Sequence, residues 1–198
     1  MRAKDKFLKK ANWIFLISIL LISKNLFAKN TEPYDLFNYN NSLANSTALF
    51  IQSDGETIEE GIIYIGSERV RVDYEKPKKI TIVLSKDKGM YINHALEETQ
   101  YFSTKTTFVN IIFSILSGGD FYETDDINIF KDSIVIKKEI ELDDVFYRVE
   151  VIYENDPIKI RKVKIVDEVS VLELGFFNHN NLINYEKEFF SFINPYLN

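Results

Sequence analysis

The amino-acid sequence predicts a mainly β protein of the α+β class, in which an antiparallel sheet is combined with an apolar helix. Three observations lead to this prediction. Short segments of alternating polarity recur along most of the chain, and turn residues separate them. One long apolar segment, residues 106–119, has the periodicity of a helix rather than of a strand.

The apolar helix predicted over residues 106–119 shapes the rest of the interpretation. Its main apolar stripe recurs at helical spacing and consists of Phe108, Ile111, Ile112, Ile115 and Leu116. Val109 and Phe113 lie off this stripe, so the helix is apolar nearly all round and must be covered on more than one side. Thr106 or Thr107 can cap its start, and Gly118 ends it.

Strand patterns flank this helix on both sides, and this arrangement permits two interpretations. In the first, two β halves curve around an apolar hollow and the helix closes it. In the second, the helix is an ordinary core helix of an α+β domain. The periodicity of the sequence does not separate the two.

The first 28 residues have the composition of a secretory signal peptide. Basic residues from Arg2 to Lys10 precede an apolar run over residues 13–22, and the small residue Ala28 follows. The apolar run has ten residues, whereas a helix needs about 20 to span a bilayer, so a permanent anchor is the weaker interpretation. We therefore expect cleavage after Ala28 and a single domain over residues 29–198.

Charge and cysteine content limit the classes of function. Loss of residues 1–28 removes six basic residues and one acidic residue, which takes the net charge from −6 to −11. Such an acidic chain is not expected to bind nucleic acid. The chain has no cysteine, which excludes disulfides, thiol catalysis, cysteine metal sites and lipid attachment at an N-terminal cysteine. We expect a periplasmic monomer.

The first half of the predicted domain begins with a weak helix after Pro33 and continues as an antiparallel meander. Asp54 and Gly55 form the turn of its first hairpin. The segment over residues 69–74 alternates strictly, with Val70, Val72 and Tyr74 predicted to point inward. The strands predicted in this half cover residues 47–52, 61–66, 69–74, 80–84, 90–94 and 99–102.

The second half also reads as strands. These cover residues 127–130, 133–140, 145–153, 158–166 and 169–177, with a last extended piece at 188–193. The basic run 158–166 suggests either a patch for anionic lipid headgroups or a strand with one solvated face, and its alternation favours the strand. Lys162 and Lys164 share the parity of Ile158 and Ile160, so we predict a bulge within this strand.

Few residues suggest catalysis. His94 and His179 lack a second histidine at metal-ligand spacing, and no nucleotide, hydrolase or zinc-protease motif occurs. The doublets 125–126 and 143–144 are acidic, but turn positions explain them better than a glycosidase or calcium site. We expect no enzyme activity, cofactor or metal, although a carboxylate pair assembled by the fold would escape this inspection. The 16 Phe and 11 Tyr residues are typical of a binder of apolar ligands, and equally of a well-packed core.

Several loose motifs together resemble the LolA family, the periplasmic outer-membrane lipoprotein carrier proteins. They extend over most of residues 46–195. The matching positions are Phe50 and Gln52, Gly61, residues 71–77, Asp87 and Gly89 followed by Tyr91, Gln100, the helix at 108–116, and Phe189, Phe190 and Phe192 with Pro195.

The resemblance implies an incomplete, half-open antiparallel β-barrel with short lid helices across an apolar cavity that receives lipoprotein acyl chains. With strand parity, it assigns the cavity wall to Phe50, Val70, Val72, Tyr74, Ile82 and Tyr91. It assigns the lid helix to Phe108, Ile111, Ile112, Ile115 and Leu116. The implied partners are acylated lipoproteins, an inner-membrane lipoprotein-releasing complex and an outer-membrane receptor. An exported binder of another lipid, such as a glycolipid or polyketide, and a hydrolase remain the alternatives.

One departure from the family pattern concerns the latch of the lid. The family usually has Arg-Pro where this chain has Gly66 and Ser67, and that arginine is thought to hold the lid through hydrogen bonds to helix backbone. Arg69 lies three residues further on and therefore on the opposite face of the strand. The resemblance thus leaves the latch unassigned.

Overall fold

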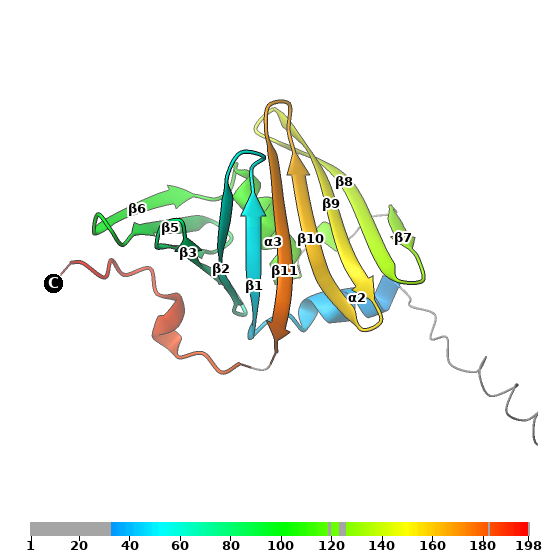
Figure 1. Ribbon diagram of the computed structural model, residues 1–198, viewed down its shortest axis with the longest axis horizontal. Coiled ribbons are helices and arrows are strands. Elements are labelled where there is room, and N and C mark those ends of the chain that lie inside the picture. The colour runs from blue at the N-terminus through cyan, green and yellow to red at the C-terminus, as the bar shows by residue number, and fades with distance from the viewer. Residues whose placement is uncertain (1–32, 119, 123–125, 182, 198) are drawn as a thin grey trace, which may run out of the picture. The chain divides into compact units, whose positions relative to one another are not determined.

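The computed structural model describes residues 33–118, 120–122, 126–181 and 183–197 (Figure 1). The chain from Glu32 onward forms one compact unit. The predicted signal peptide and the cleavage after Ala28 lie outside the described residues and stay predictions.

In the part of the chain that the structure describes, eleven strands form one antiparallel sheet with the order β6-β5-β4-β3-β2-β1-β11-β10-β9-β8-β7. The sheet does not close, which confirms an incomplete barrel. The strands of the first meander are β1 Ser46–Ser53, β2 Ile58–Ile65, β3 Val70–Lys76, β4 Ile80–Leu84, β5 Lys88–Asn93 and β6 Glu98–Ser103. Those of the second are β7 Ile127–Ile129, β8 Ser133–Leu142, β9 Val145–Asn155, β10 Ile158–Val166 and β11 Val171–Asn180.

The two meanders meet where β1 pairs with β11. This pairing leaves β6 and β7, which follow each other in the sequence, at opposite edges of the sheet. The chain between them must therefore cross one face, and it does so as helix α3, Phe108–Ser117. In Figure 1 this helix lies behind β1 and β11. We call the face that carries α3 the inner face.

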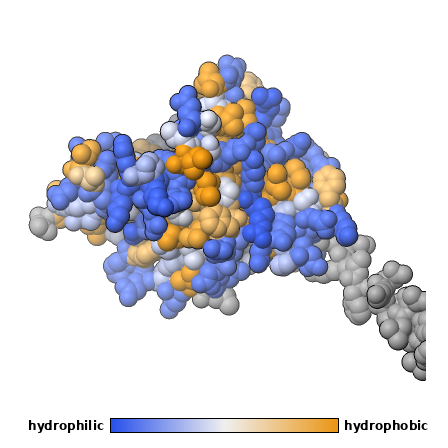
Figure 2. Space-filling view, in the orientation of Figure 1, coloured by the Kyte–Doolittle hydropathy of each residue, from blue (hydrophilic) through white to orange (hydrophobic). Residues whose placement is uncertain are grey.

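Both faces of the sheet bury apolar residues. On the inner face a large cluster includes Phe50 and Ile63 together with Ile115 of α3. Figure 2 shows the molecule in the orientation of Figure 1, where hydrophilic residues surround smaller apolar groups. The second cluster, on the outer face, consists of Val83, Met90 and Ile92, with Phe192 and Tyr196 packed against it.

The bulge predicted in β10 is confirmed. The register of β10 against β9 shifts between Ile160 and Lys162. The shift restores the alternation, because Ile160 and Val163 are both buried. Lys162 and Lys164 both pair with Glu173, at 2.7 and 2.9 Å. The basic run is therefore a strand with a solvated, ion-paired face.

Helix α3 differs from its prediction at two points. Thr107 is the N-cap residue, but its side chain makes no capping bond and donates instead to the Thr104 carbonyl at 3.1 Å. The predicted stripe is also partly wrong, because Phe113 is buried while Phe108 is 41% exposed. The predicted end is confirmed, since Gly118 adopts a left-handed conformation (φ 73°) and its N–H bonds the Ser114 carbonyl.

The predicted weak helix after Pro33 is confirmed as α2, Pro33–Asn41. It buries Leu36 and Asn40. The Tyr39 hydroxyl accepts a hydrogen bond of 2.9 Å from the N–H of Ile160 in β10. This bond fills a backbone donor beside the bulge, so α2 supports the second meander where its ladder is interrupted.

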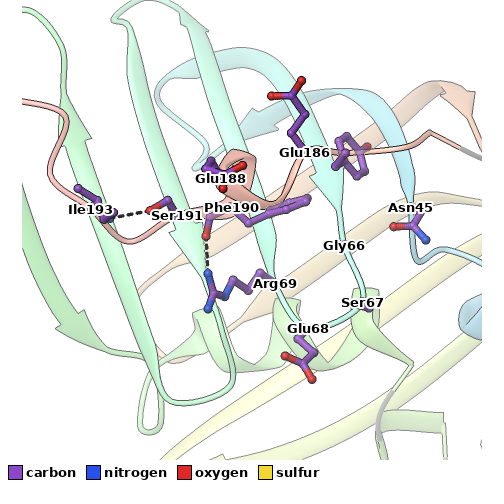
Figure 3. A pocket seen from close by; sticks show the side chains of 11 residues that line it. Asn45, Gly66, Ser67, Glu68, Arg69, Glu186, Glu188, Phe190, Ser191 and Ile193 are labelled. Carbon is purple, nitrogen blue, oxygen red and sulfur yellow. Dashed lines mark hydrogen bonds between the residues drawn. The ribbon is translucent and has the colours of Figure 1, made fainter.

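The prediction of an extended segment at 188–193 is wrong. The chain instead forms a 3-10 helix, η3 Lys187–Phe190, which lies on the outer face. Arg69 donates to the Phe190 carbonyl at 2.8 Å (Figure 3). Arg71 donates to the Phe189 carbonyl at 3.0 Å. The Phe189 ring stacks on Tyr185 at 5.2 Å and meets the edge of Tyr64 at 4.8 Å. A compact turn is favoured over a strand here, because its backbone carbonyls accept hydrogen bonds from the two arginines and its rings stack on the sheet.

Replacement of Phe189 by alanine tests this attachment. Phe189→Ala removes three ring contacts, with Tyr64, Tyr185 and Phe190, and the cation–π contact with Arg71 (4.5 Å). We expect a loss of about 1–2 kcal/mol in the free energy of unfolding. Urea denaturation measures it, and limited proteolysis should show faster cleavage after residue 183. Phe146→Ala is the control, because Phe146 is 60% exposed. Equal effects of both substitutions would contradict the attachment.

Candidate functional site

A cavity of about 260 Å³ lies between α3 and the inner face of the sheet. Strands β1, β2, β3, β4, β6 and β11 line it from the sheet side, and the first half of α3 lines it from the other side. The lining residues are Phe50, Gln52, Ile63, Val72, Tyr74, Ile82, Leu84, Phe102, Phe108, Val109, Ile112, Leu174 and Phe176. No charged side chain belongs to this described lining.

Two polar side chains reach this cavity, and both are satisfied. The Tyr74 hydroxyl donates to Gln52 Oε1 at 2.9 Å, and Gln52 Nε2 donates to Glu59 Oε2 at 3.0 Å. Burial raises the pKa of Tyr74, with a further rise from the nearby Glu59 carboxylate, so the phenol stays neutral at ordinary pH. The Phe50 ring meets the Tyr74 ring edge-on at 5.1 Å. The lining of the cavity is therefore apolar and uncharged, which suits an apolar guest.

A second hollow, of about 360 Å³, lies along the other flank of α3. Helix residues Ile111 and Phe113 line it together with Phe121, Ile140 and Leu142. Lys86 and Lys138 also belong to its lining. The helix thus separates two hollows, which explains why its apolar residues face two directions.

A third groove, of about 470 Å³, lies under the C-terminal segment on the outer face (Figure 3). Its walls carry Glu68, Glu186 and Glu188 beside Arg69. Carboxylates at the wall disfavour an apolar guest, because their desolvation is costly. The groove is therefore a poorer candidate than the cavity beneath α3, although it is larger.

Buried hydroxyl groups anchor the C-terminal end of α3. The Tyr122 hydroxyl donates to the Ile115 carbonyl at 2.5 Å. This carbonyl belongs to the last turn of the helix, where backbone acceptors lack helical partners. The Tyr122 oxygen lies 2.7 Å from the Tyr153 hydroxyl, which also lies 3.3 Å from Asn40 Oδ1. Burial raises the pKa of both tyrosines, so the chain of hydroxyls stays uncharged.

The segment before α3 is fixed in a similar way. Thr104 is fully buried, and its hydroxyl lies within hydrogen-bond distance of the carbonyls of Ser85 (3.1 Å) and Lys86 (2.8 Å). Between these two anchors, the first half of α3 faces the cavity through Phe108, Val109 and Ile112. This half is more exposed than the second half of the helix, where Ile115 and Leu116 are buried.

A family model identifies the chain. The model described as outer membrane lipoprotein carrier protein LolA matches residues 45–193. The chain belongs to the LolA family. This match confirms the resemblance seen in the sequence, and the members of this family are carrier proteins.

Solved structures resemble the LolA-family chain in fold. An uncharacterized conserved protein from Thermus thermophilus is 10% identical, with a TM-score of 0.50, and the match covers 82% of this chain and 93% of that one. A putative outer membrane lipoprotein-sorting protein domain from Vibrio parahaemolyticus is 9% identical, with a TM-score of 0.43, over 81% of this chain and 95% of that one. No curated protein gives a significant sequence match.

Several of the wall residues predicted for this LolA-family chain lie around one cavity. Phe50, Val72, Tyr74 and Ile82 line it. Val70 does not: it is 1% exposed and belongs to the surrounding core. Tyr91 is absent from the lining as well, although it pairs with Ile82 across β4 and β5.

Among the predicted lid residues, Phe108 and Ile112 line the cavity. Ile111 faces the second hollow, and Ile115 and Leu116 are buried in the core. The cavity is therefore covered by the first half of α3.

Sequence inspection missed Phe102, whose ring forms part of the wall. This residue pairs with Gly89 across β5 and β6. A Cβ atom at position 89 would lie 2.2 Å from the Phe102 ring, so the ring can fold over the strand only because residue 89 is glycine. A glycine opposite an aromatic residue was the available signal.

The latch of this LolA-family chain differs from the family pattern. Arg69 binds the C-terminal segment on the outer face through the Phe190 carbonyl, as its parity predicts, so it does not hold α3. The bond from Tyr122 to Ile115 instead ties a side chain to the helix backbone.

The other polar candidates have structural partners. His94 shares hydrogen bonds with Thr81 Oγ1 (2.9 Å) and the Tyr196 hydroxyl (2.8 Å), and His179 bonds the Ile160 carbonyl (2.9 Å). The doublet 143–144 forms the turn between β8 and β9, whereas position 125 lies outside the described residues. Within the described ranges no group of three His, Asp or Glu residues could hold a metal ion. Of the helices in those ranges, none has the length and apolar character needed to cross a bilayer.

Tyr122→Phe tests the anchor of α3. The substitution leaves the Ile115 carbonyl without its buried donor, and we expect a loss of about 1–3 kcal/mol in stability. Amide hydrogen exchange in the last turn of α3 should become faster, because this turn opens more easily. Tyr34→Phe is the control, since Tyr34 is 69% exposed. Unchanged exchange in α3 would show that the bond does not hold the helix.

Proposed function

We propose that this protein binds the acyl chains of lipoproteins in the cavity beneath α3 and carries lipoproteins through the periplasm from the inner to the outer membrane. The observation that carries the proposal is an uncharged, apolar cavity beneath a short helix, in a chain of the LolA family. An inner-membrane releasing complex would load the protein, and an outer-membrane receptor would unload it.

The size of the cavity sets how an acyl chain would be accommodated. Pockets for small ligands usually measure about 300–1,000 Å³, and the cavity measures about 260 Å³. A full acyl chain therefore requires the first half of α3 to move away from the sheet. Because hollows flank the helix on both sides, this movement would join them into a larger space.

The same movement moderates affinity. Burial of an acyl chain contributes about 0.8 kcal/mol per methylene, so about a dozen methylenes would give roughly 10 kcal/mol. A carrier with that net affinity would release its cargo slowly. If the guest replaces contacts of Phe108, Val109 and Ile112, the net affinity is the difference between two burials, and transfer to a receptor becomes feasible.

A matched pair of tryptophan substitutions tests the proposal. Val109→Trp fills the cavity from the helix side, whereas Val145→Trp places the same change at an exposed hairpin position. Purified protein is incubated with native inner membranes, and acylated polypeptides in the supernatant are measured by mass spectrometry. We expect the parent and Val145→Trp to release them equally and Val109→Trp to release about tenfold less, which corresponds to about 1.4 kcal/mol.

Other outcomes of this experiment would contradict the proposal. Equal release by all three proteins would show that the cavity is not the acyl site. Release of a glycolipid or another lipid, without acylated polypeptide, would show that the protein carries a different cargo.

A further inference from the structure

We propose that the free edge of β6 binds the polypeptide part of an acylated cargo as an additional β-strand. The inference rests on the proposed function, because it concerns the segment that continues from a lipid-bearing residue held at the cavity. It identifies the place and the chemistry of polypeptide recognition, which the acyl cavity alone does not supply.

The pairing pattern determines which backbone groups of β6 face outward. The His94 N–H bonds the Lys79 carbonyl, and the Thr104 N–H bonds the Asp87 carbonyl. Hydrogen-bonded pairs alternate along an antiparallel ladder, so the even-numbered residues of β6 bond β5. The N–H and C=O groups at positions 99 and 101 therefore point away from the sheet.

The outer face of the same strand is held firmly. Thr99 Oγ1 donates to Asn194 Oδ1 at 2.9 Å, and the Tyr101 hydroxyl donates to the Phe192 carbonyl at 3.0 Å. These bonds involve side chains on the outer face, and among the described residues no hydrogen bond is formed with the outward N–H and C=O groups of Thr99 and Tyr101. A strand that is already ordered loses little conformational entropy when another strand pairs with it.

The two edges of the sheet are protected to different degrees. The edge strand β7 has only three residues, a length that limits pairing with another chain. The edge strand β6 has six residues and contains no proline or lysine, and Glu98 is its one charged residue. Tyr101 beside this edge is 57% exposed. The β6 edge thus lacks the devices that usually block strand addition.

The cavity reaches this edge strand. Its lining includes Phe102, which belongs to β6 itself and is partly buried. Phe108 of α3, which is 41% exposed, belongs to the same lining. A polypeptide attached to an acyl chain in the cavity therefore starts within reach of β6.

Strand addition also fits the needs of a lipoprotein carrier. A carrier of many cargoes meets many polypeptide sequences, and side-chain recognition would restrict their range. Main-chain hydrogen bonds supply affinity that is largely independent of sequence. The outward groups of Thr99 and Tyr101 can bond two alternate residues of an extended segment.

Two substitutions at Tyr101 separate the backbone from the side chain. Tyr101→Ala and Tyr101→Pro both remove the hydroxyl bond to Phe192, but only proline removes the outward N–H. The probes are a synthetic peptide carrying a palmitoyl group at its N-terminus and free palmitate, and calorimetry measures their affinities. We expect Tyr101→Pro to bind the palmitoyl peptide about tenfold more weakly than Tyr101→Ala, with equal affinities for palmitate.

Equal binding of the palmitoyl peptide by the two variants would overturn the proposal. If the parent binds neither probe, the acyl-carrier function is refuted. If the parent binds palmitate and the palmitoyl peptide with equal affinity, only the edge proposal is overturned. Hydrogen exchange on the parent provides a second measurement if proline disturbs folding. Protection of the Thr99 and Tyr101 amides by the palmitoyl peptide but not by palmitate supports strand addition, and no added protection overturns it.

Discussion

The pairing of β1 with β11 is the constraint on which the rest of the structure depends. It joins the first strand of the domain to the last in the middle of the sheet. Two consecutive strands, β6 and β7, then become the two edges, and the chain between them has to cross the inner face. An apolar helix on that path is covered by sheet on one side and flanked by hollows on two others. The order of the strands therefore determines where the cavity lies, and the side chains determine its lining.

The residues that line the cavity leave this space without filling it. Phe102 folds over Gly89, and Phe108 and Ile112 close the space from the helix. None of these side chains introduces a charge, and the hydroxyl of Tyr74 is satisfied by Gln52. The outer face is different, because arginine and aromatic residues there hold the C-terminal segment in place. The inner face of the sheet therefore carries the apolar cavity, and the outer face carries the C-terminal segment, which is held by polar and aromatic contacts.

Sequence periodicity predicted most of the sheet, because strand parity is a local property. The parity change at Lys162 in the basic run revealed the β10 bulge. Other features depend on contacts between distant residues. In α3, Phe113 is buried instead of the predicted Phe108. The reason is that hollows lie on both flanks of the helix, and a single apolar stripe predicts only one buried face. The compact turn near Phe189 depends on contacts with β2 and β3, which lie more than a hundred residues away in the sequence.

Within the candidate site the same division holds. On the inner face of β3, Val72 and Tyr74 line the cavity, whereas Val70 on the same face is buried in the core. Whether a residue on the inner face lines the cavity or the core depends on where α3 crosses the sheet. No local sequence pattern contains that information. The role of Tyr122 in holding α3 could not be predicted from the sequence for the same reason, because only the tertiary structure brings Tyr122 and Tyr153 together.

The hydroxyl chain of Tyr122, Tyr153 and Asn40 determines how the helix responds to its surroundings. A clasp built on an ion pair would weaken with added salt and with acid. The tyrosine clasp contains no charge, and burial moves the pKa of both phenols further into the alkaline range. The grip on α3 is consequently indifferent to ionic strength and to acidity over the range in which most proteins operate, so that opening is left to a guest or a partner rather than to the medium.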